Sequence, residues 1–465
     1  MHGSKWAMSV GARRPGRLAL RAVLTVLAGV PAVLLAVTAS AAAAISPSTP
    51  YMGWNTYYGV GGRFNEATIE SVAGSLVNSG LARAGYRIVW LDFGWASGAR
   101  NANGELVVDP NQWPHGLNGL TAWLHQQGLE AGIYTDAGST GCNGQGVGSL
   151  GHYQQDADAF AAWGFDAVKV DFCGAGQQGL DPRVQYQQFA AALAGNSSHR
   201  PMLLNVCNFW TPGQIDGTNP SVISSSYDNY QWAPPIAQSW RTDTDIGFPR
   251  NIVFANVLRN LDADAAHPEV AGPGHWNDPD YLGPELGMSS TEAQSQFSMW
   301  AMLAAPLIIG SDPRALSQAS ISMLENPQVL AVDQDSLGVQ GSLVAQFGSA
   351  QVWVKPLWGG ARAVALLNRG TGTVRISTTA LAVGLPKAAR YILQNLWTNQ
   401  TTTTQSAISA LVPGHGVVLY RTAVTPGPRK SRKRATKDRA KQIHRARAGK
   451  RRTAAADKKA KPRRR

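Results

Sequence analysis

Cysteine is scarce in this chain: its 465 residues include only three, Cys142, Cys173 and Cys207. Three cysteines allow at most one internal disulfide and leave one thiol over. The sequence contains no Cys-x-x-Cys, no His-x-x-x-His and no His-Glu-x-x-His. Because these spacings are typical of zinc sites, their absence argues against a bound metal ion.

Acidic residues are absent from the first part of the chain and rare in the last. Residues 1–44 carry five basic and no acidic residues, and residues 426–465 carry nineteen basic and two acidic ones. Between them lie 18 basic and 27 acidic residues, so the net charge there is −9 although that of the whole chain is +13. The overall charge therefore does not predict that the folded part binds nucleic acid or a membrane surface.

The two basic ends have the composition of non-globular segments. Residues 1–44 are Arg-rich up to Arg21, then apolar, and finish in Ser-Ala-Ala-Ala-Ala, which predicts a cleaved signal peptide and a secreted, extracellular protein. The alternative is an uncleaved membrane anchor, because residues 22–44 approach the roughly 20 residues that span a bilayer. The Arg13-Arg14 pair leaves Sec and twin-arginine export both open.

Residues 425–465 contain no aromatic residue and are dominated by Lys, Arg and Ala. Such a segment cannot bury enough apolar surface to fold, so we expect a disordered basic tail. The tail is either a dispensable solvated segment or one that binds an anionic cell-surface polymer. Nucleic acid is not an expected partner of an exported chain.

Between these ends, apolar runs alternate with segments of helical periodicity, such as 117–127, 153–163 and 291–304. The eight runs are 52–55, 88–92, 131–136, 167–171, 202–207, 239–242, 275–278 and 307–310. This α/β pattern predicts a (β/α)8 TIM barrel over 45–335, with a doubly wound sheet as the alternative. Four further β-rich segments, 351–355, 363–368, 391–397 and 416–420, predict an antiparallel β-domain over 336–424.

Nearly every predicted barrel strand ends in polar or aromatic residues. These are Trp54, Asp92, Tyr134, Asp136, Lys169, Asp171, Cys207, Asn208, Arg241, Asp245, Asp278 and Asp280. One such Asp is more often a helix cap than a catalyst. Seven strand ends in succession instead predict an active site at the C-terminal face of the barrel, where these ends meet.

Cleavage of a glycosidic bond needs two carboxyl groups, one as nucleophile or base and one as proton donor. Asp171 ends an apolar strand, and Lys169 points to the same side because strand side chains alternate. A cation there keeps the carboxylate ionised, as a nucleophile must be. Asp245 is the best-placed partner acid, with Asp243 and Asp278 as alternatives. Fifteen tryptophans suit the stacking of sugar rings.

Six ordered segments resemble the signature of glycoside hydrolase family 27, the α-galactosidase or melibiase family. They are YMGWN at 51–55, GIYTDAG at 132–138, GSLGH at 148–152, VKVDFC at 168–173, WRTDTDI at 240–246 and GPGHWNDPD at 272–280. The likeness covers about 50–424. It implies a TIM barrel with a C-terminal β-sandwich and a retaining double displacement without metal or organic cofactor.

The resemblance also implies roles for single residues. Asp171 matches the family nucleophile and Asp245 the acid/base. Cys142 and Cys173 match a disulfide beside the site, which leaves Cys207 unpaired near the pocket wall. The positions expected to bind substrate are Trp54, Asp92, Tyr134, Lys169, Asn208, Arg241 and Asp280. The implied substrate is an oligo- or polysaccharide of the α-galactoside type.

Two departures from the family pattern bear on the sugar. Phe93 follows Asp92 where most members have a second Asp, and Asn208-Phe209-Trp210 follows Cys207 where many have Glu-Trp. A Phe cannot accept hydrogen bonds from sugar hydroxyls, so the pocket should favour the axial hydroxyl less strongly. α-Galactosidase is the expected activity, and β-L-arabinopyranosidase and isomaltose-releasing dextranase are alternatives. A non-catalytic carbohydrate- or wall-binding protein is a further one, against which both carboxylates and Lys169 argue.

Overall fold

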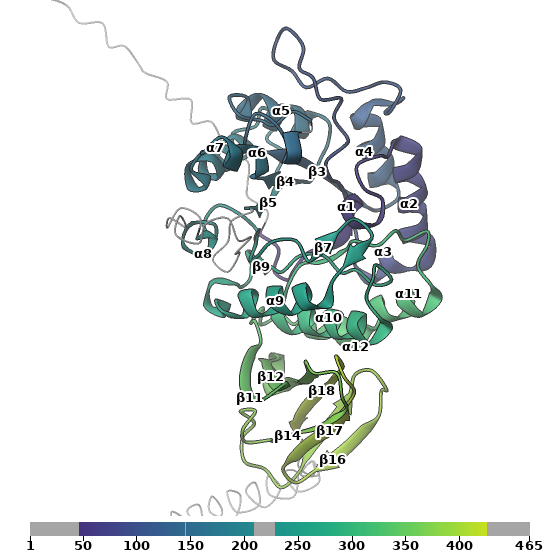
Figure 1. Cartoon of the computed structure of the whole chain (residues 1–465), viewed down its shortest axis with the longest axis vertical. Coiled ribbons are helices and arrows are strands. Elements are labelled where there is room, and N and C mark those ends of the chain that lie inside the picture. The colour runs from purple at the N-terminus through teal and green to yellow at the C-terminus, as the bar shows by residue number, and fades with distance from the viewer. Residues whose placement is uncertain (1–45, 145, 209–227, 426–465) are drawn as a thin grey trace, which may run out of the picture. The chain divides into compact units, whose positions relative to one another are not determined.

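The computed structural model describes residues 46–144, 146–208 and 228–425 (Figure 1). The predicted signal peptide (1–44) and the basic tail after residue 425 lie outside the described residues. Among the helices that the structure describes, none is long and apolar enough to cross a bilayer.

The first part of the fold is a barrel of eight parallel strands. They are β1 (Met52–Asn55), β2 (Ile88–Leu91), β3 (Glu130–Asp136), β4 (Ala167–Asp171), β5 (Leu203–Cys207), β6 (Ser239–Arg241), β9 (Trp276–Asp278) and β10 (Leu307–Ile309). Their order is β10-β1-β2-β3-β4-β5-β6-β9. Leu282, just after β9, closes the circle: its N–H donates to Ile308 O (2.7 Å) and its carbonyl accepts from Gly310 N (2.7 Å). The predicted (β/α)8 barrel is confirmed, and the doubly wound sheet is wrong.

Helices connect the strands and cover the barrel (Figure 1). They are α1 (Thr56–Gly59), α2 (Glu66–Ser79), α3 (Leu81–Ala84), α4 (Gly116–Gln126), α5 (Tyr153–Ala162), α6 (Cys173–Gln177), α7 (Pro182–Ala194), α8 (Asn229–Trp232), α9 (Phe254–Ala265), α10 (Ser290–Leu303), α11 (Gln318–Leu324) and α12 (Pro327–Asp333). Local chemistry sets their starts: Asn65 caps α2, Asp181 caps α7 before Pro182, and Ser289 with Glu292 forms a capping box on α10.

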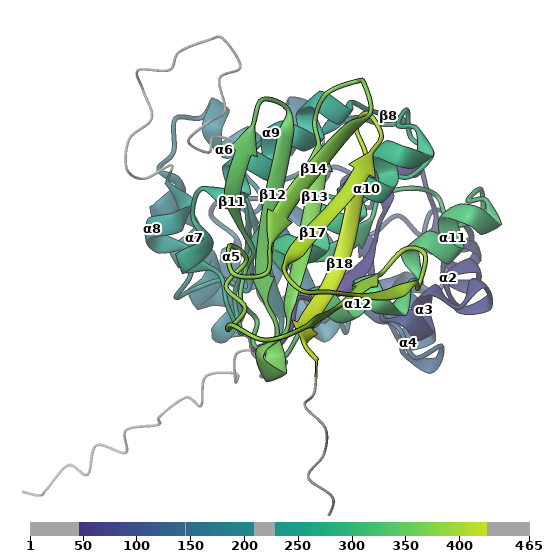
Figure 2. The same cartoon turned by 90° about the horizontal axis from the view of Figure 1, so that it is seen from below.

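A C-terminal domain of antiparallel strands follows α12 (Figure 2). One sheet has the order β11-β12-β13-β18-β15-β16 and a second consists of β14 and β17. The bounds are β11 (Ser342–Phe347), β12 (Ala350–Pro356), β13 (Arg362–Asn368), β14 (Val374–Thr379), β15 (Tyr391–Asn395), β16 (Thr401–Thr404), β17 (Ala407–Val412) and β18 (Val417–Val424). Val352, Val364 and Leu366 of the first sheet share a core with Ile376 and Ile408 of the second, so the domain is the predicted β-sandwich.

Helix α10 packs between the barrel and this sandwich, which explains why nearly all of it is buried. Ser295 Oγ donates to the carbonyl of His415 (2.7 Å), and the buried Lys355 Nζ donates to the carbonyl of Ala301 (2.8 Å). A buried ammonium is costly unless it is paired and hydrogen-bonded. These bonds therefore join the sandwich to the helix that supports β10.

Candidate active site

A cavity of about 540 Å³ opens at the C-terminal ends of the barrel strands. It is lined by Tyr57, Asp92, Phe93, Tyr134, Cys142, Lys169, Asp171, Cys173, Gly176, Gln177, Cys207, Asp245, Phe248 and Pro249. These residues lie at or near the C-terminal ends of β3, β4 and β5 or follow β1, β2, β3, β4 and β6, so the cavity lies at the face that the sequence predicts. A volume of this size is typical of a pocket that binds a small molecule.

A buried ion pair forms one wall of the cavity. Lys169 Nζ lies 2.8 Å from Asp92 Oδ2, and Asn55 Nδ2 donates to the same oxygen at 2.9 Å. Burial acts to lower the pKa of Lys169, but the carboxylate of Asp92 and other neighbours hold that pKa well above its usual value. Lys169 is therefore an ammonium that presents its charge to the cavity beside a hydrogen-bonded carboxylate.

Asp171 is the last residue of β4 and lies next to Asp136 of β3 in the sheet register. Its Oδ1 accepts a hydrogen bond from Phe172 N (2.9 Å). Burial raises the pKa of Asp171 to about 7; Lys169 acts in the opposite direction and Asp136 adds to the rise. The carboxyl group of Asp171 is thus a nucleophile candidate whose ionisation depends on two named neighbours.

The predicted disulfide between Cys142 and Cys173 is present and borders Asp171. Cys142 Sγ lies 3.2 Å from Asp171 Oδ2, and Cys173 Sγ lies 3.7 Å from Oδ1. Since both sulfurs are bonded to each other, neither is a thiolate that could ligate a metal. Cys207 carries the free thiol and lines the cavity, as the sequence predicts.

Asp136 holds the two loops that carry this disulfide. Its buried carboxylate accepts hydrogen bonds from the backbone N–H groups of Gly138 (2.6 Å), Gly174 (3.0 Å) and Ala175 (3.1 Å). A Cβ on Gly174 would lie 1.9 Å from the carbonyl oxygen of Thr140, so only glycine fits there. Asp136 therefore fixes the backbone of the two loops that follow β3 and β4, next to Asp171.

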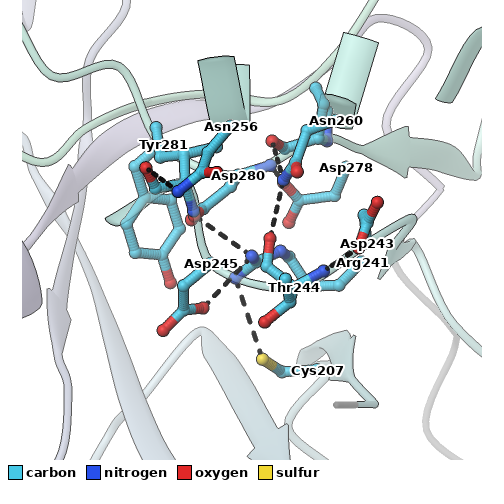
Figure 3. Close-up of polar contacts among 12 residues, drawn as sticks. Cys207, Arg241, Asp243, Thr244, Asp245, Asn256, Asn260, Asp278, Asp280 and Tyr281 are labelled. Atoms are coloured by element: carbon cyan, nitrogen blue, oxygen red, sulfur yellow. Dashed lines mark hydrogen bonds and ion pairs between the residues drawn. The ribbon is translucent and has the colours of Figure 1, made fainter. Parts of the chain in front are cut away.

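Asp245 follows β6 and is held by Arg241 (Figure 3). Arg241 Nη2 lies 3.2 Å from Asp245 Oδ1 and 3.1 Å from Asp280 Oδ2. The side chain of Asp280 is 1% exposed and accepts from Tyr58 OH (2.6 Å), whereas that of Asp245 is 35% exposed. Asp245 is therefore the carboxylate of this group that faces the cavity.

Side chains of α9 hold the backbone of the same loop (Figure 3). Asn260 Nδ2 donates to the carbonyl of Thr244 (2.7 Å), and Arg259 Nη2 donates to that of Asp245 (3.0 Å). Arg259 Nε also lies 3.4 Å from Asp243 Oδ2. Asp243 is thus engaged outside the cavity, and Asp245 is fixed through both its side chain and its backbone.

Of the residues predicted to be catalytic or to bind substrate, five line the cavity: Asp92, Tyr134, Lys169, Asp171 and Asp245. Four others lie behind its lining: Trp54, Asn208, Arg241 and Asp280. Trp54 Nε1 donates to the carbonyl of Ser311 (2.8 Å), and Asn208 Nδ2 donates to Asn229 Oδ1 (2.8 Å). Phe209 and Trp210 lie outside the described residues. The two rival carboxylates, Asp243 and Asp278, do not line the cavity.

Sequence reasoning missed several residues of the lining. Tyr57 and Gln177 come from helices α1 and α6, and Phe248 and Pro249 come from a hairpin that follows β6. Phe248 belongs to a two-residue strand, β7 (Gly247–Phe248), that pairs with β8 (Asn251–Ile252). An aromatic residue three positions after Asp245 is the signal that could have identified it.

Comparisons with known proteins agree with this geometry. A family model described as alpha galactosidase A matches residues 62–335, and one described as the alpha galactosidase C-terminal beta sandwich domain matches 347–422. A probable alpha-galactosidase of Dictyostelium discoideum is 37% identical over 378 residues, which cover 80% of this chain and 91% of that protein.

Two solved structures are similar over the same region. Alpha-galactosidase I from Mortierella vinacea has a TM-score of 0.73 at 28% identity, covering 82% of this chain and 99% of its own. An alpha-galactosidase from Saccharomyces cerevisiae with raffinose has a TM-score of 0.70 at 25% identity, covering 82% and 100%.

Proposed function

The chain belongs to the α-galactosidase family, glycoside hydrolase family 27, and we propose on that basis that it is a retaining α-galactosidase that releases terminal α-D-galactosyl residues. The observation that carries this proposal is the presence of two carboxyl groups in one cavity, Asp171 at the end of β4 and Asp245 in the loop after β6. The cavity is bounded on one side by the buried Lys169–Asp92 pair. A pocket of this kind suits the end of a sugar chain, and the pair offers a donor and acceptors to its hydroxyls.

We propose a double displacement, the mechanism that the family resemblance implies. The carboxylate of Asp171 attacks the anomeric carbon while the carboxyl group of Asp245 gives its proton to the glycosidic oxygen, which leaves with the bond's electron pair. Asp245 then takes a proton from water, which attacks the galactosyl–Asp171 ester and frees the nucleophile. Two inversions restore the α-configuration in galactose.

Activity should be lost as the pH falls through about 7, because burial raises the pKa of Asp171 to about this value and a protonated carboxyl group cannot attack. Asp136→Asn removes a neighbouring negative charge, so the pKa of Asp171 should fall and the acidic limb of kcat/KM should move to lower pH. The measurement is the pH profile of kcat/KM for p-nitrophenyl α-galactoside. An unmoved limb in a folded variant would show that Asp136 does not influence the nucleophile.

Phe93 lies in the cavity wall at a position that bears on which sugar the enzyme prefers. Its ring lines the cavity beside Asp92 and contacts Tyr57 with ring centroids 6.0 Å apart. Asp92 is engaged by Lys169 and Asn55, so this wall has one acceptor side chain where the family pattern has two. We infer weaker selection for the galactose hydroxyls at C4 and C6, which keeps α-glucosides, epimeric at C4, and β-L-arabinopyranosides, which lack C6, as candidate secondary substrates.

Phe93→Asp should raise the preference for α-galactoside over α-glucoside by roughly tenfold to a hundredfold, because a carboxylate that binds a hydroxyl discriminates against its epimer. The measurement compares kcat/KM for p-nitrophenyl α-galactoside, α-glucoside and β-L-arabinopyranoside. Phe93→Leu removes the ring without adding an acceptor and is the matched control. The same ratio of kcat/KM for α-galactoside over α-glucoside in both variants would mean that residue 93 does not bind the hydroxyl that distinguishes these sugars.

We further propose that the protein is exported and that its tail retains it at an anionic cell surface. The support is the sequence alone: an export-signal pattern over 1–44, and nineteen basic against two acidic residues over 426–465. The full chain should bind a polyphosphate-type wall polymer in low salt and release it as salt screens the charges. Deleting 426–465 should abolish this binding and leave kcat/KM unchanged in a pull-down and activity assay. Binding that survives the deletion would exclude the tail as its source.

A further inference from the structure

The rim of the cavity carries an aromatic ring that the mechanism above does not use. Phe248 is 74% exposed, the highest value among the large hydrophobic side chains that the structure describes. A single exposed apolar residue needs no explanation. Phe248 differs because it also lines the cavity that contains Asp171 and Asp245, and it lies three residues after Asp245. Its ring is therefore open to solvent and to a bound substrate.

The backbone around Phe248 is anchored on both sides. In the β7–β8 hairpin, Phe248 pairs with Asn251 and Gly247 with Ile252. Arg250 N donates to the carbonyl of Tyr58 (2.8 Å), and Ile252 N donates to that of Leu286 (2.6 Å). A Cβ on Gly247 would lie 2.2 Å from the carbonyl oxygen of Asn251, so the hairpin needs glycine at this close approach. The ring thus stands on a fixed support, which reduces the entropy lost when a ligand packs against it.

The position of the proton donor, Asp245, indicates which part of the substrate lies near the ring of Phe248. Asp245 must protonate the glycosidic oxygen, so the leaving group extends from Asp245. The Lys169–Asp92 pair belongs to a buried wall of the cavity, with 7% and 3% of the two side chains exposed, and we place the galactosyl ring there. The side chain of Asp245 is partly exposed, and Phe248 is the strongly exposed aromatic residue that follows it.

We propose that Phe248 forms a leaving-group subsite, on which the first sugar ring of the departing saccharide stacks through its apolar C–H face. This inference rests on the proposed function and extends it from the galactosyl pocket to the rest of the substrate. Aromatic side chains suit this role because they offer a large apolar face at small entropic cost. The hairpin therefore selects α-galactosides whose leaving group is itself a sugar.

The test compares a substrate with a sugar leaving group, raffinose, with one that has none, α-galactosyl fluoride. Phe248→Ala should lower kcat/KM for raffinose by about threefold to tenfold, the effect of losing one aromatic contact. Hydrolysis of the fluoride and inhibition by free galactose should stay unchanged. Phe248→Tyr keeps the ring and should retain wild-type raffinose hydrolysis. Phe347→Ala is the matched control, since Phe347 is 68% exposed on β11 of the sandwich.

Two results would overturn the subsite: an unchanged kcat/KM for raffinose in Phe248→Ala, or an equal loss with raffinose and the fluoride. Either would leave α-galactosidase activity in place, because the wild-type enzyme would still hydrolyse both substrates. A wild-type protein that turns over neither substrate would instead contradict the proposed function, and the subsite with it.

Discussion

Replacing Asp171 with alanine should lower kcat/KM for p-nitrophenyl α-galactoside by at least about a thousandfold, because the carboxylate that forms the glycosyl-enzyme is then missing. The fold should survive, since the side chain of Asp171 accepts one backbone hydrogen bond, from Phe172 N, and ends a strand whose core residues remain. Activity is measured by release of p-nitrophenol, and folding by near-ultraviolet circular dichroism.

Added azide provides a positive control for this variant. The missing carboxylate leaves space beside the anomeric carbon, and azide attacking from that side inverts the centre once, giving β-galactosyl azide. Formation of this product would identify the face from which Asp171 normally attacks. Wild-type turnover in the folded Asp171→Ala protein would refute the assignment of the nucleophile.

Asp245→Ala should show a loss that depends on the leaving group. Raffinose needs protonation of its glycosidic oxygen, so kcat/KM should fall by about a hundredfold to ten-thousandfold. The fluoride ion of α-galactosyl fluoride leaves without being protonated, so the first step with this substrate should be much less affected. Azide should restore the second step and yield α-galactosyl azide, because the intermediate on Asp171 is attacked from the opposite face.

Asp243→Ala is the matched control for this experiment. Asp243 is two residues from Asp245, but Arg259 Nε lies 3.4 Å from its Oδ2 and it does not line the cavity. Removal of its side chain should disturb the loop and lower kcat/KM for raffinose and for α-galactosyl fluoride by the same factor. A leaving-group dependence seen in Asp243→Ala and not in Asp245→Ala would show that Asp243, and not Asp245, is the acid/base.

The barrel was predictable because its strands are buried on both faces and read as short apolar runs. All five residues of Ala167–Asp171 are buried, and the predicted and observed bounds coincide. Four sandwich strands, β11, β14, β16 and β17, were missed, and two of them are the opposite case. β16 is four threonines, none of them buried, and β11 is largely exposed, so neither shows the alternation that identifies a half-buried strand.

Some cavity residues could be predicted from the barrel topology, and others could not because long-range contacts position them. Topology places Asp92, Lys169 and Asp171 at strand ends, so their approach follows once the barrel is recognised. Phe248 lies on a hairpin whose position depends on hydrogen bonds to distant residues, such as Arg250 N to the carbonyl of Tyr58. Such long-range contacts leave no local pattern. Spacing could not separate Asp243 from Asp245 either, because the choice depends on which arginine each one meets.

Identification of the residue that carries the galactosyl group in the intermediate is the most direct test of a double displacement through Asp171. In 5-fluoro-α-galactosyl fluoride, the ring fluorine slows both chemical steps, and the fluoride leaving group keeps the first one fast enough for the intermediate to accumulate. Mass spectrometry of the digested protein should then find the fluorogalactosyl group on Asp171. A label on another carboxylate such as Asp245 or Asp92, or no label together with an inverted first product, would contradict the double displacement proposed here.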